Sequence, residues 1–193
     1  MDWLKRGHNW AAYNERAIEV PLGISFLNRH GPNTVEVGAV LSYYKERGII
    51  QHPIIDLYDI ADTLKVSATE YSYLGKDVLS ISTLEHLGKG DFGEVTSDKL
   101  PKLFWERMRY ARTYLITSPL GYNSISDSLI FEADQRGVFY LKKLDINNNW
   151  GYSNLEEAKE LKYGEPFGWA NGLAVVTNDL YYLENDIFST DFV

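Results

Sequence analysis

Six short apolar runs alternate with longer, helix-like segments along this chain, and that alternation points to one fold class. The runs are bounded by polar residues, glycine or proline, and they lie at 34–38, 53–58, 77–82, 113–118, 138–144 and 172–178. Such runs are typical of strands buried on both faces of a sheet. The segments "VLSYYKERG", "SDKLPKLFWERMRYAR" and "NLEEAKELKYG" have helical spacing, with Asn154 as the expected N-cap of the third. The sequence therefore predicts a doubly wound α/β fold with a mainly parallel sheet and helices on both faces.

The chain has room for one domain with a full core, because it has 193 residues of which 45% are hydrophobic. We expect an N-terminal helical segment at 1–30, a core at 31–180 and an acidic tail at 181–193. These parts form a single domain in this interpretation.

A lid over a ligand could come from two places. The N-terminal segment carries Trp3, Trp10 and Tyr13, and the loop at 145–154 reads "DINNNWGYSN". Exposed aromatic side chains of this kind would serve either a lid or a contact between subunits of an oligomer.

Composition excludes several classes of protein. No run reaches the roughly 20 apolar residues that cross a bilayer, and "MDWLKRGHNW" lacks the apolar core of a secretion signal, so we expect a cytoplasmic protein without a membrane span. With 0 cysteines the chain has no disulfide, thiolate metal ligand or cysteine nucleophile. We expect no metal site.

The charge distribution argues against nucleic acid as a partner. The formal net charge is −8, and residues 151–193 carry 2 basic and 8 acidic side chains. A protein that reads a duplex shows a basic face. The best candidate for a basic face is a group of five residues with helical spacing, Lys99, Lys102, Arg107, Arg109 and Arg112. We interpret this group as the solvent side of a surface helix.

Ligands of doubly wound sheets bind beyond the carboxyl ends of the strands. Gly38 follows the first run, where it lets a ligand approach the backbone or simply makes a tight turn. The residues at 39–42 lack the further glycines that a pyrophosphate needs, which disfavours NAD and FAD and leaves an adenosyl ligand without phosphates. Asp56 directly follows Ile54 and Ile55 of the second run and is placed to bind ribose hydroxyls, with Asp59 as a reserve or a helix cap.

The run "DVLSISTLEHLG" brings a carboxylate and an imidazole to the same edge of the sheet. Glu85 and His86 follow its strand, and an imidazole there is either a structural group or a base for a substrate proton. At the end of the run at 113–118, "SPLGYN" contains Tyr122 and Asn123, which would wall a substrate pocket or form a rigid proline turn.

In the blocks "VEVGAVLSYY", "PIIDLYD" and "DVLSISTLEHLG", in this order, the sequence resembles the class I S-adenosylmethionine-dependent methyltransferases. More narrowly, it is similar to small bacterial and phage-type enzymes with "ISTLEH" and "SPLGYN" blocks, over about Tyr13 to Asn178. The block "RAIEVP" at 16–21 looks like the arginine, glutamate and proline signature of related enzymes. The resemblance implies a Rossmann-like fold with a seven-stranded sheet.

The resemblance also implies residue roles. Glu36 and Gly38 would lie beside the methionine part of the cofactor, and Asp56 would hold its ribose. Adenine contacts fall near Ala68, Thr69 and Glu70, while Ser82 and Thr83 pass the methionine moiety. His86 would be the catalytic base, Glu85 would orient it or bind the substrate, and the acceptor would contact Tyr122, Asn123 and Glu19.

We therefore expect a methyltransferase that uses S-adenosyl-L-methionine and acts on a small molecule or a glycan precursor. Methyl transfer is an in-line displacement, and a hydroxyl acceptor would lose its proton to His86. One alternative is a binding or scaffold protein on the same fold without turnover. A nucleotide-sugar or NAD-dependent enzyme is disfavoured by the missing glycines.

Overall fold

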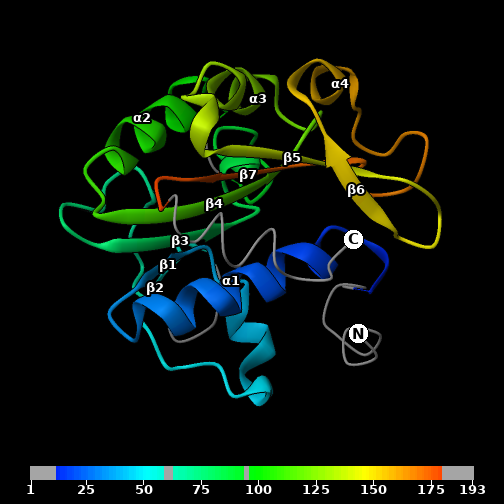
Figure 1. The fold of residues 1–193 in the computed structure, drawn as a ribbon. Coiled ribbons are helices and arrows are strands. Elements are labelled where there is room, and N and C mark those ends of the chain that lie inside the picture. The colour runs from blue at the N-terminus through cyan, green and yellow to red at the C-terminus, as the bar shows by residue number, and fades with distance from the viewer. Residues whose placement is uncertain (1–11, 59–62, 94–95, 180–193) are drawn as a thin grey trace.

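The computed structural model describes residues 12–58, 63–93 and 96–179, and it has an α/β fold built on one seven-stranded sheet (Figure 1). The strands are β1 Val35–Val37, β2 Ile54–Ile55, β3 Asp77–Ile81, β4 Thr113–Pro119, β5 Val138–Lys143, β6 Trp150–Ser153 and β7 Gly172–Thr177. The helices are α1 Arg16–His30, α2 Lys99–Met108, α3 Ser124–Phe131 and α4 Leu155–Glu160, with short 3-10 helices η3 Leu41–Arg47, η4 Leu84–His86 and η5 Gln135–Gly137.

The strand order across the sheet is β2-β1-β3-β4-β7-β5-β6. Neighbours from β2 to β4 pair in parallel, whereas β7 is antiparallel to both β4 and β5, and β6 is antiparallel to β5. Five strands therefore point one way and two point the other. The predicted α/β class and mainly parallel sheet are confirmed, and the sheet is mixed.

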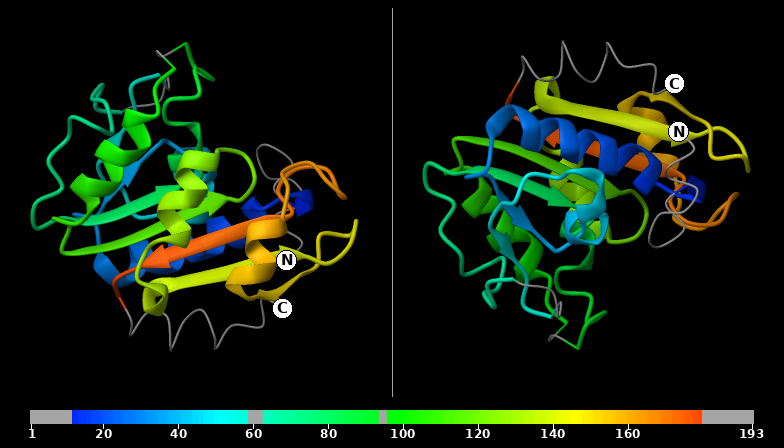
Figure 2. Two further views of the ribbon diagram at one scale, coloured as in Figure 1. Left: turned by 90° about the horizontal axis from the view of Figure 1, so that it is seen from above. Right: turned by 90° about the horizontal axis from the view of Figure 1, so that it is seen from below.

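Helices cover both faces of this sheet. Figure 2 shows α2, α3 and α4 over one face and α1 with η3 over the other. Because side chains alternate along a strand, β3 contributes Leu79 and Ile81 to the core under α1 and Val78 to the core under α2. The runs are continuous in apolar residues because each strand supplies two cores.

Helix α1 runs along β3 and β4, from their carboxyl ends back to the amino end of β4. Near its start, the Glu19 carboxylate accepts hydrogen bonds from Ser82 and Thr117, which lie at the carboxyl ends of β3 and β4. At its end, His30 Nδ1 lies 3.5 Å from Thr113 Oγ1 at the amino end of β4. The first residues of α1 are thereby fixed at the edge where the parallel strands end.

Local signals in the sequence account for several helix boundaries. The predicted cap Asn154 is confirmed, since its Oδ1 accepts a hydrogen bond from the Glu157 amide at 2.9 Å. Helix α4 ends at Glu160, before the end of the helix-like segment, which runs to Gly164. The segment after β1 forms the 3-10 helix η3, with a kink at Tyr44, in place of a regular α-helix.

Two elements were not expected from the sequence. The segment predicted as a lid loop at 145–154 contains the edge strand β6, which pairs with β5 from Tyr140↔Ser153 to Lys143↔Trp150. A four-residue strand gives too short a pattern to separate from a loop. Helix α3 follows "SPLGYN" and is capped by Asn123, whose Oδ1 accepts from the Ile125 amide at 3.1 Å.

The basic residues expected on a surface helix do lie on the solvent side of α2 and its C-terminal extension, and all of them are exposed. The expected lid residues Trp3 and Trp10, the reserve Asp59 and the acidic tail at 181–193 lie outside the described residues. Among the helices that the structure describes, none combines the length and the hydropathy that a membrane crossing requires.

A buried carboxyl group in α3 makes stability depend on pH. Asp127 Oδ2 accepts a hydrogen bond from the Gly121 amide at 3.1 Å, whereas Oδ1 is buried with no partner among the described residues. Burial raises the pKa of Asp127 to about 6. The folded state therefore holds this proton more tightly than the unfolded chain, in which aspartate titrates near ~4.

We expect the free energy of unfolding to fall as the pH rises from about 4 through about 6, because the folded state then loses a proton that it binds preferentially. Asp127→Asn replaces the titrating carboxyl group by a neutral amide. It should raise the free energy of unfolding by about 1–2 kcal/mol near pH 7.5 and change it little near pH 4. Urea unfolding at both pH values measures the difference. An equal gain at both would contradict this account.

Candidate functional site

A cavity of about 330 Å³ lies at the carboxyl ends of β1, β2 and β3. The chain leaves β1, forms β2 on one side of it and returns to β3 on the other, so the strand order reverses here. Such a reversal separates the loops after neighbouring strands and leaves a crevice in which open α/β sheets bind ligands. The volume is within the range of about 300–1,000 Å³ that small-molecule sites occupy.

Gly38 brings the backbone after β1 up to this cavity. Its φ is +82°, and a Cβ added there would lie 2.2 Å from Thr83 Oγ1. Thr83 is held in that place, because its hydroxyl donates to the carbonyl of Val37 at 2.9 Å. Only glycine therefore fits at position 38.

Glu36 stabilises the same turn from behind the cavity. Its side chain is fully buried, and its oxygens lie 2.7 Å from the Leu41 amide nitrogen and 2.7 Å from His52 Nε2. Burial raises the pKa of Glu36, and the hydrogen bonds from His52 and Leu41 oppose that rise. Glu36 is outside the cavity wall and fixes the backbone that forms it.

Asp56 connects the loops that follow β1 and β2. One carboxylate oxygen accepts from the Ala39 amide at 3.1 Å, and the other accepts from the Tyr58 amide at 2.8 Å. Asp56 also lines the cavity. Each carboxylate oxygen has two lone pairs, so a single oxygen can accept more than one hydrogen bond.

The far wall contains part of the predicted adenine region. Ala68 and Thr69 line the cavity, while Glu70 is exposed and lies outside the lining. Tyr58 and Phe92 stack with ring centroids 6.1 Å apart, and both rings belong to the lining. This wall offers aromatic and apolar surface with few polar groups.

Ser82 lies at the end of β3 with a φ of +41°, a conformation that a non-glycine residue rarely adopts. Its hydroxyl donates to Glu19 Oε1 at 2.7 Å, and its amide donates to the Thr117 carbonyl. Backbone strain of this kind persists where surrounding contacts enforce it, and it is frequent at functional sites. The turn at Ser82 and Thr83 directs the chain across the cavity.

Glu19 is fully buried and lines neither cavity. Its second oxygen accepts from Arg16 Nη1 at 2.7 Å. Instead of contacting a substrate, as the resemblance implied, Glu19 supports Arg16 and Ser82, which do line the cavity.

A second cavity, of about 40 Å³, lies beside the first and shares Arg16, Ser82 and His86 with it. Its remaining lining residues are Glu15, Glu85, Pro119, Tyr122 and Tyr163. Burial, followed by the charges of Glu19 and Glu15, raises the pKa of Glu85 well above its ordinary value. The same burial effect raises the pKa of Glu15.

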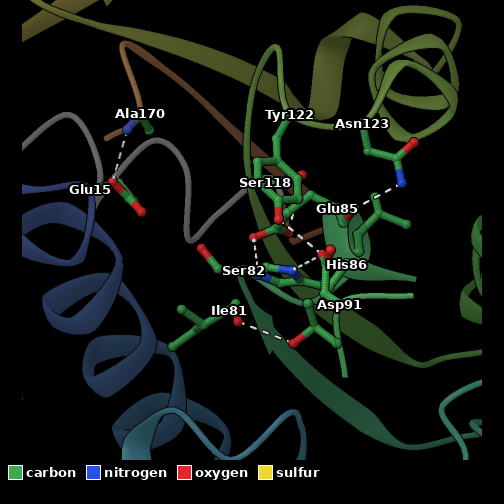
Figure 3. A network of polar contacts seen from close by, with 12 residues as sticks. Glu15, Ile81, Ser82, Glu85, His86, Asp91, Ser118, Tyr122, Asn123 and Ala170 are labelled. Carbon is green, nitrogen blue, oxygen red and sulfur yellow. Dashed lines mark hydrogen bonds and ion pairs between the residues drawn. The ribbon is translucent and has the colours of Figure 1, made fainter. Parts of the chain in front are cut away.

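His86 lies between the two cavities in a network of polar contacts (Figure 3). Its Nδ1 lies 2.7 Å from Asp91 Oδ2, and that carboxylate also accepts from the Tyr122 hydroxyl at 3.0 Å. The sequence suggested Glu85 as the partner that orients His86, but Glu85 Oε1 is 3.8 Å from His86 Nε2. Asp91 holds the imidazole instead.

Asn123 has a structural role next to these groups. Its Nδ2 donates to the carbonyls of Glu85 and Leu87, which fixes η4, and its Oδ1 caps α3. Tyr122, its neighbour, lines the small cavity. Burial and the hydrogen bond to Asp91 raise the pKa of Tyr122 to about 12, so this phenol stays protonated at neutral pH.

The structure thus brings together most of the residues predicted for the site. Gly38, Asp56, Thr69, Ser82 and Thr83 line the large cavity, His86 lines both, and Glu85 and Tyr122 line the small one. Sequence reasoning missed Glu15, Asp91 and Tyr163. Asp91 could have been predicted from the sequence, because it follows His86 by five residues in a glycine-rich turn, and such a turn can bring a carboxylate back to the imidazole.

Within the part of the chain that the structure describes, no group of three side chains has an arrangement that could hold a metal ion. A comparison with models of protein families finds none that matches the chain, and no curated protein matches it significantly.

Gly38→Ala should destabilise the protein by about 2–4 kcal/mol, because it adds both the strain of a positive φ and a clash with Thr83 Oγ1. In the background Thr83→Ser the clash remains, whereas in Thr83→Ala the hydroxyl is gone and we expect partial recovery. Thermal unfolding of the single and double variants measures both effects. Full tolerance of Gly38→Ala would contradict the geometry of this turn.

Proposed function

We propose that this protein is a methyltransferase that uses S-adenosyl-L-methionine and transfers the methyl group to a small molecule or a glycan precursor. The observation that carries the proposal is the cavity at the strand-order reversal, with Gly38 and Asp56 in its wall. A backbone that a ligand can approach and a carboxylate that accepts hydrogen bonds suit an adenosyl group. The strand order with its reversed β7 agrees with the Rossmann-like fold that the sequence resemblance implied.

The parts of the cavity correspond to the parts of the cofactor in this proposal. Asp56 binds the ribose hydroxyls, and the wall with Ala68, Thr69 and the Tyr58 ring takes the adenine. The methionine portion lies along the turn at Gly38 and the strained turn at Ser82 and Thr83. Glu36 acts through the backbone that it holds.

The turn after β1 favours a ligand without phosphates. A pyrophosphate needs several free amide groups at a helix N-terminus. Here the Ala39 amide is bonded to Asp56, and the Leu41 amide is bonded to Glu36. These bonds leave too few donors for a dinucleotide, but they do not obstruct an adenosyl group with a sulfonium side chain.

Methyl transfer requires alignment of the acceptor, the methyl carbon and the sulfur. Positioning of reactants supplies up to roughly 7–11 kcal/mol of the barrier in well-aligned systems. The acceptor would enter from the small cavity, where Glu85 and His86 lie next to Ser82. His86 would take the proton of a hydroxyl acceptor, and its place between the two cavities supports that role.

A second candidate is a protein of the same fold that binds a ligand without turnover. The observation in its favour is that both oxygens of Asp56 already accept hydrogen bonds from backbone amides. A ribose would then have to share these oxygens or displace one of the bonds. Cofactor affinity without methylation of any acceptor would favour this candidate.

Calorimetric titration with S-adenosylmethionine and S-adenosylhomocysteine tests the proposal. We expect micromolar binding by the unaltered protein, and Asp56→Ala should weaken it by at least about tenfold, since it removes the acceptor of the ribose hydroxyls. Asp56→Asn should give an intermediate loss, because one oxygen remains.

Asp134→Ala is the matched control. Asp134 is exposed, precedes β5 at the edge of the sheet opposite the cavity, and pairs with Arg136. Thermal unfolding of each variant separates lost binding from lost folding. Folded protein that shows no heat with either ligand would refute the proposed function.

A further inference from the structure

The small cavity beside the cofactor site raises the question of which acceptor it takes. We propose that it receives an uncharged, hydroxyl-bearing acceptor such as a sugar, and that Asp91 positions His86 to remove the hydroxyl proton. This inference rests on the proposed function. It goes further by naming the class of acceptor, the reacting atom and a positioning residue.

The hydrogen bond between His86 and Asp91 determines which ring nitrogen can act as a base. A carboxylate only accepts hydrogen bonds, so at 2.7 Å from Asp91 Oδ2 the Nδ1 atom of His86 carries a proton. In the neutral imidazole the lone pair is then on Nε2. His86 lines both cavities and its Nε2 is 3.8 Å from Glu85 Oε1, so the basic atom lies at the small cavity.

Aromatic contacts fix the orientation of the His86 ring. Phe92 and Tyr122 each meet it edge-on with ring centroids 5.2 Å away. The Tyr122 hydroxyl donates to the same oxygen of Asp91 that His86 contacts. The charged groups nearby are Glu85 on η4, Arg16 at the start of α1, and Lys89, whose Nζ lies 5.4 Å from the centroid of the Tyr122 ring. A histidine that acts as a general base is typically held in one tautomer and one ring orientation in this way.

Buried carboxyl groups in the small cavity disfavour a negatively charged acceptor. Glu85 is 2% exposed; among the other described residues, Ser118 Oγ lies 3.5 Å from its Oε2 and His86 Nε2 lies 3.8 Å from its Oε1. Glu15 is 7% exposed and lines the same cavity. Arg16 is the cation among them, and Glu19 already binds it at 2.7 Å. A phosphate or carboxylate in this cavity would lie next to carboxyl oxygens, with no free cation to balance its charge among the described lining residues, and its binding would be disfavoured.

The same groups suit a sugar hydroxyl. A volume of about 40 Å³ holds a hydroxyl or hydroxymethyl group but no ring. Glu85 offers Oε1 as an acceptor, and when protonated it can donate as well. Tyr122 and Tyr163, with ring centroids 5.0 Å apart, provide aromatic surface for the rest of the acceptor.

The base distinguishes a hydroxyl from an amine. A neutral amine attacks with its lone pair and loses its proton after transfer, whereas a hydroxyl oxygen is weakly nucleophilic until its proton leaves. In the proposed step the O–H proton moves to His86 Nε2, the O–CH₃ bond forms and the C–S bond breaks. The products are a methyl ether, S-adenosylhomocysteine and a proton released from His86.

The positioning role is tested with Asp91→Asn, with Asp134→Asn as the matched control. The asparagine amide can donate to Nδ1 and stabilise the wrong tautomer. With whichever probe acceptor below is methylated, we expect Asp91→Asn to lower kcat by about 100-fold and to leave the affinity for S-adenosylhomocysteine unchanged. Nitrogen-15 NMR should show the Nδ1–H tautomer of His86 in the unaltered protein and its loss in Asp91→Asn. An unchanged tautomer and kcat would overturn this role.

The acceptor class is tested with three probes that differ in one group: methyl β-D-glucoside, its glucuronide and its glucosaminide. We expect saturation-transfer NMR to detect the glucoside on protein loaded with S-adenosylhomocysteine and to detect the glucuronide at least about tenfold more weakly. With S-adenosylmethionine, methylation should occur on oxygen. Equal binding of the glucuronide, methylation of the glucosaminide nitrogen, or no binding of any probe would overturn the inference.

Different results would refute the proposed function and the acceptor class. If the proposed function is wrong, the folded protein binds neither S-adenosylmethionine nor S-adenosylhomocysteine. If only the acceptor inference is wrong, cofactor binding is intact and the probes give the contrary results above. His86→Gln, which should retain cofactor binding and lose turnover, separates the base from the general integrity of the site.

Discussion

The fully buried carboxylate of Glu19 joins α1 to the carboxyl ends of β3 and β4. It accepts hydrogen bonds from Ser82 and Thr117 at 2.7 Å each and binds Arg16 Nη1 at the same distance. A buried charge is tolerated only when hydrogen bonds and an opposite charge compensate its loss of hydration. The three partners come from three elements, so the compensation is complete only when α1 packs on the sheet in this register. The strained turn at Ser82 and the position of Arg16 both depend on it.

That constraint also explains why two cavities of different chemistry lie side by side. The large one is walled mainly by apolar and aromatic residues after β1, β2 and β3, with Asp56, Ser82 and Thr83 among its polar side chains. The small one lies past Ser82, between the start of α1 and the loop after β4, and concentrates buried carboxyl groups. Ser82 and Arg16 form the boundary, and Glu19 fixes both. In the proposed reaction the methyl donor would lie in the large cavity and the acceptor in the small one, so that the two would meet at this boundary.

Electrostatics within the small cavity follow from burial more than from net charge. The charge of Glu19 raises the pKa of both Glu15 and Glu85, and one arginine cannot compensate all three carboxyl groups. Burial and this excess of carboxyl groups over cations together raise the pKa of Glu85. Perturbed carboxyl groups of this kind occur at functional sites and in structural networks alike. Here Glu19 belongs to the structural part, whereas Glu85 lines open space.

The amino-acid sequence alone predicts the α/β class, six of the seven strands and the edge of the sheet at which the two cavities lie. Continuous apolar runs and the polar residues after them carry that information locally, since each strand buries two faces and each following loop is exposed. It did not determine β6, α3 or the partner of His86. Short edge strands and helices have too few residues for a periodic signal, and the contact between His86 and Asp91 depends on how a glycine-rich turn folds. Glu36 and Glu19 lie behind the cavities, whereas Glu85 lines the small one. These positions could not be predicted from the sequence, because the place of a carboxylate relative to a cavity depends on how distant elements pack.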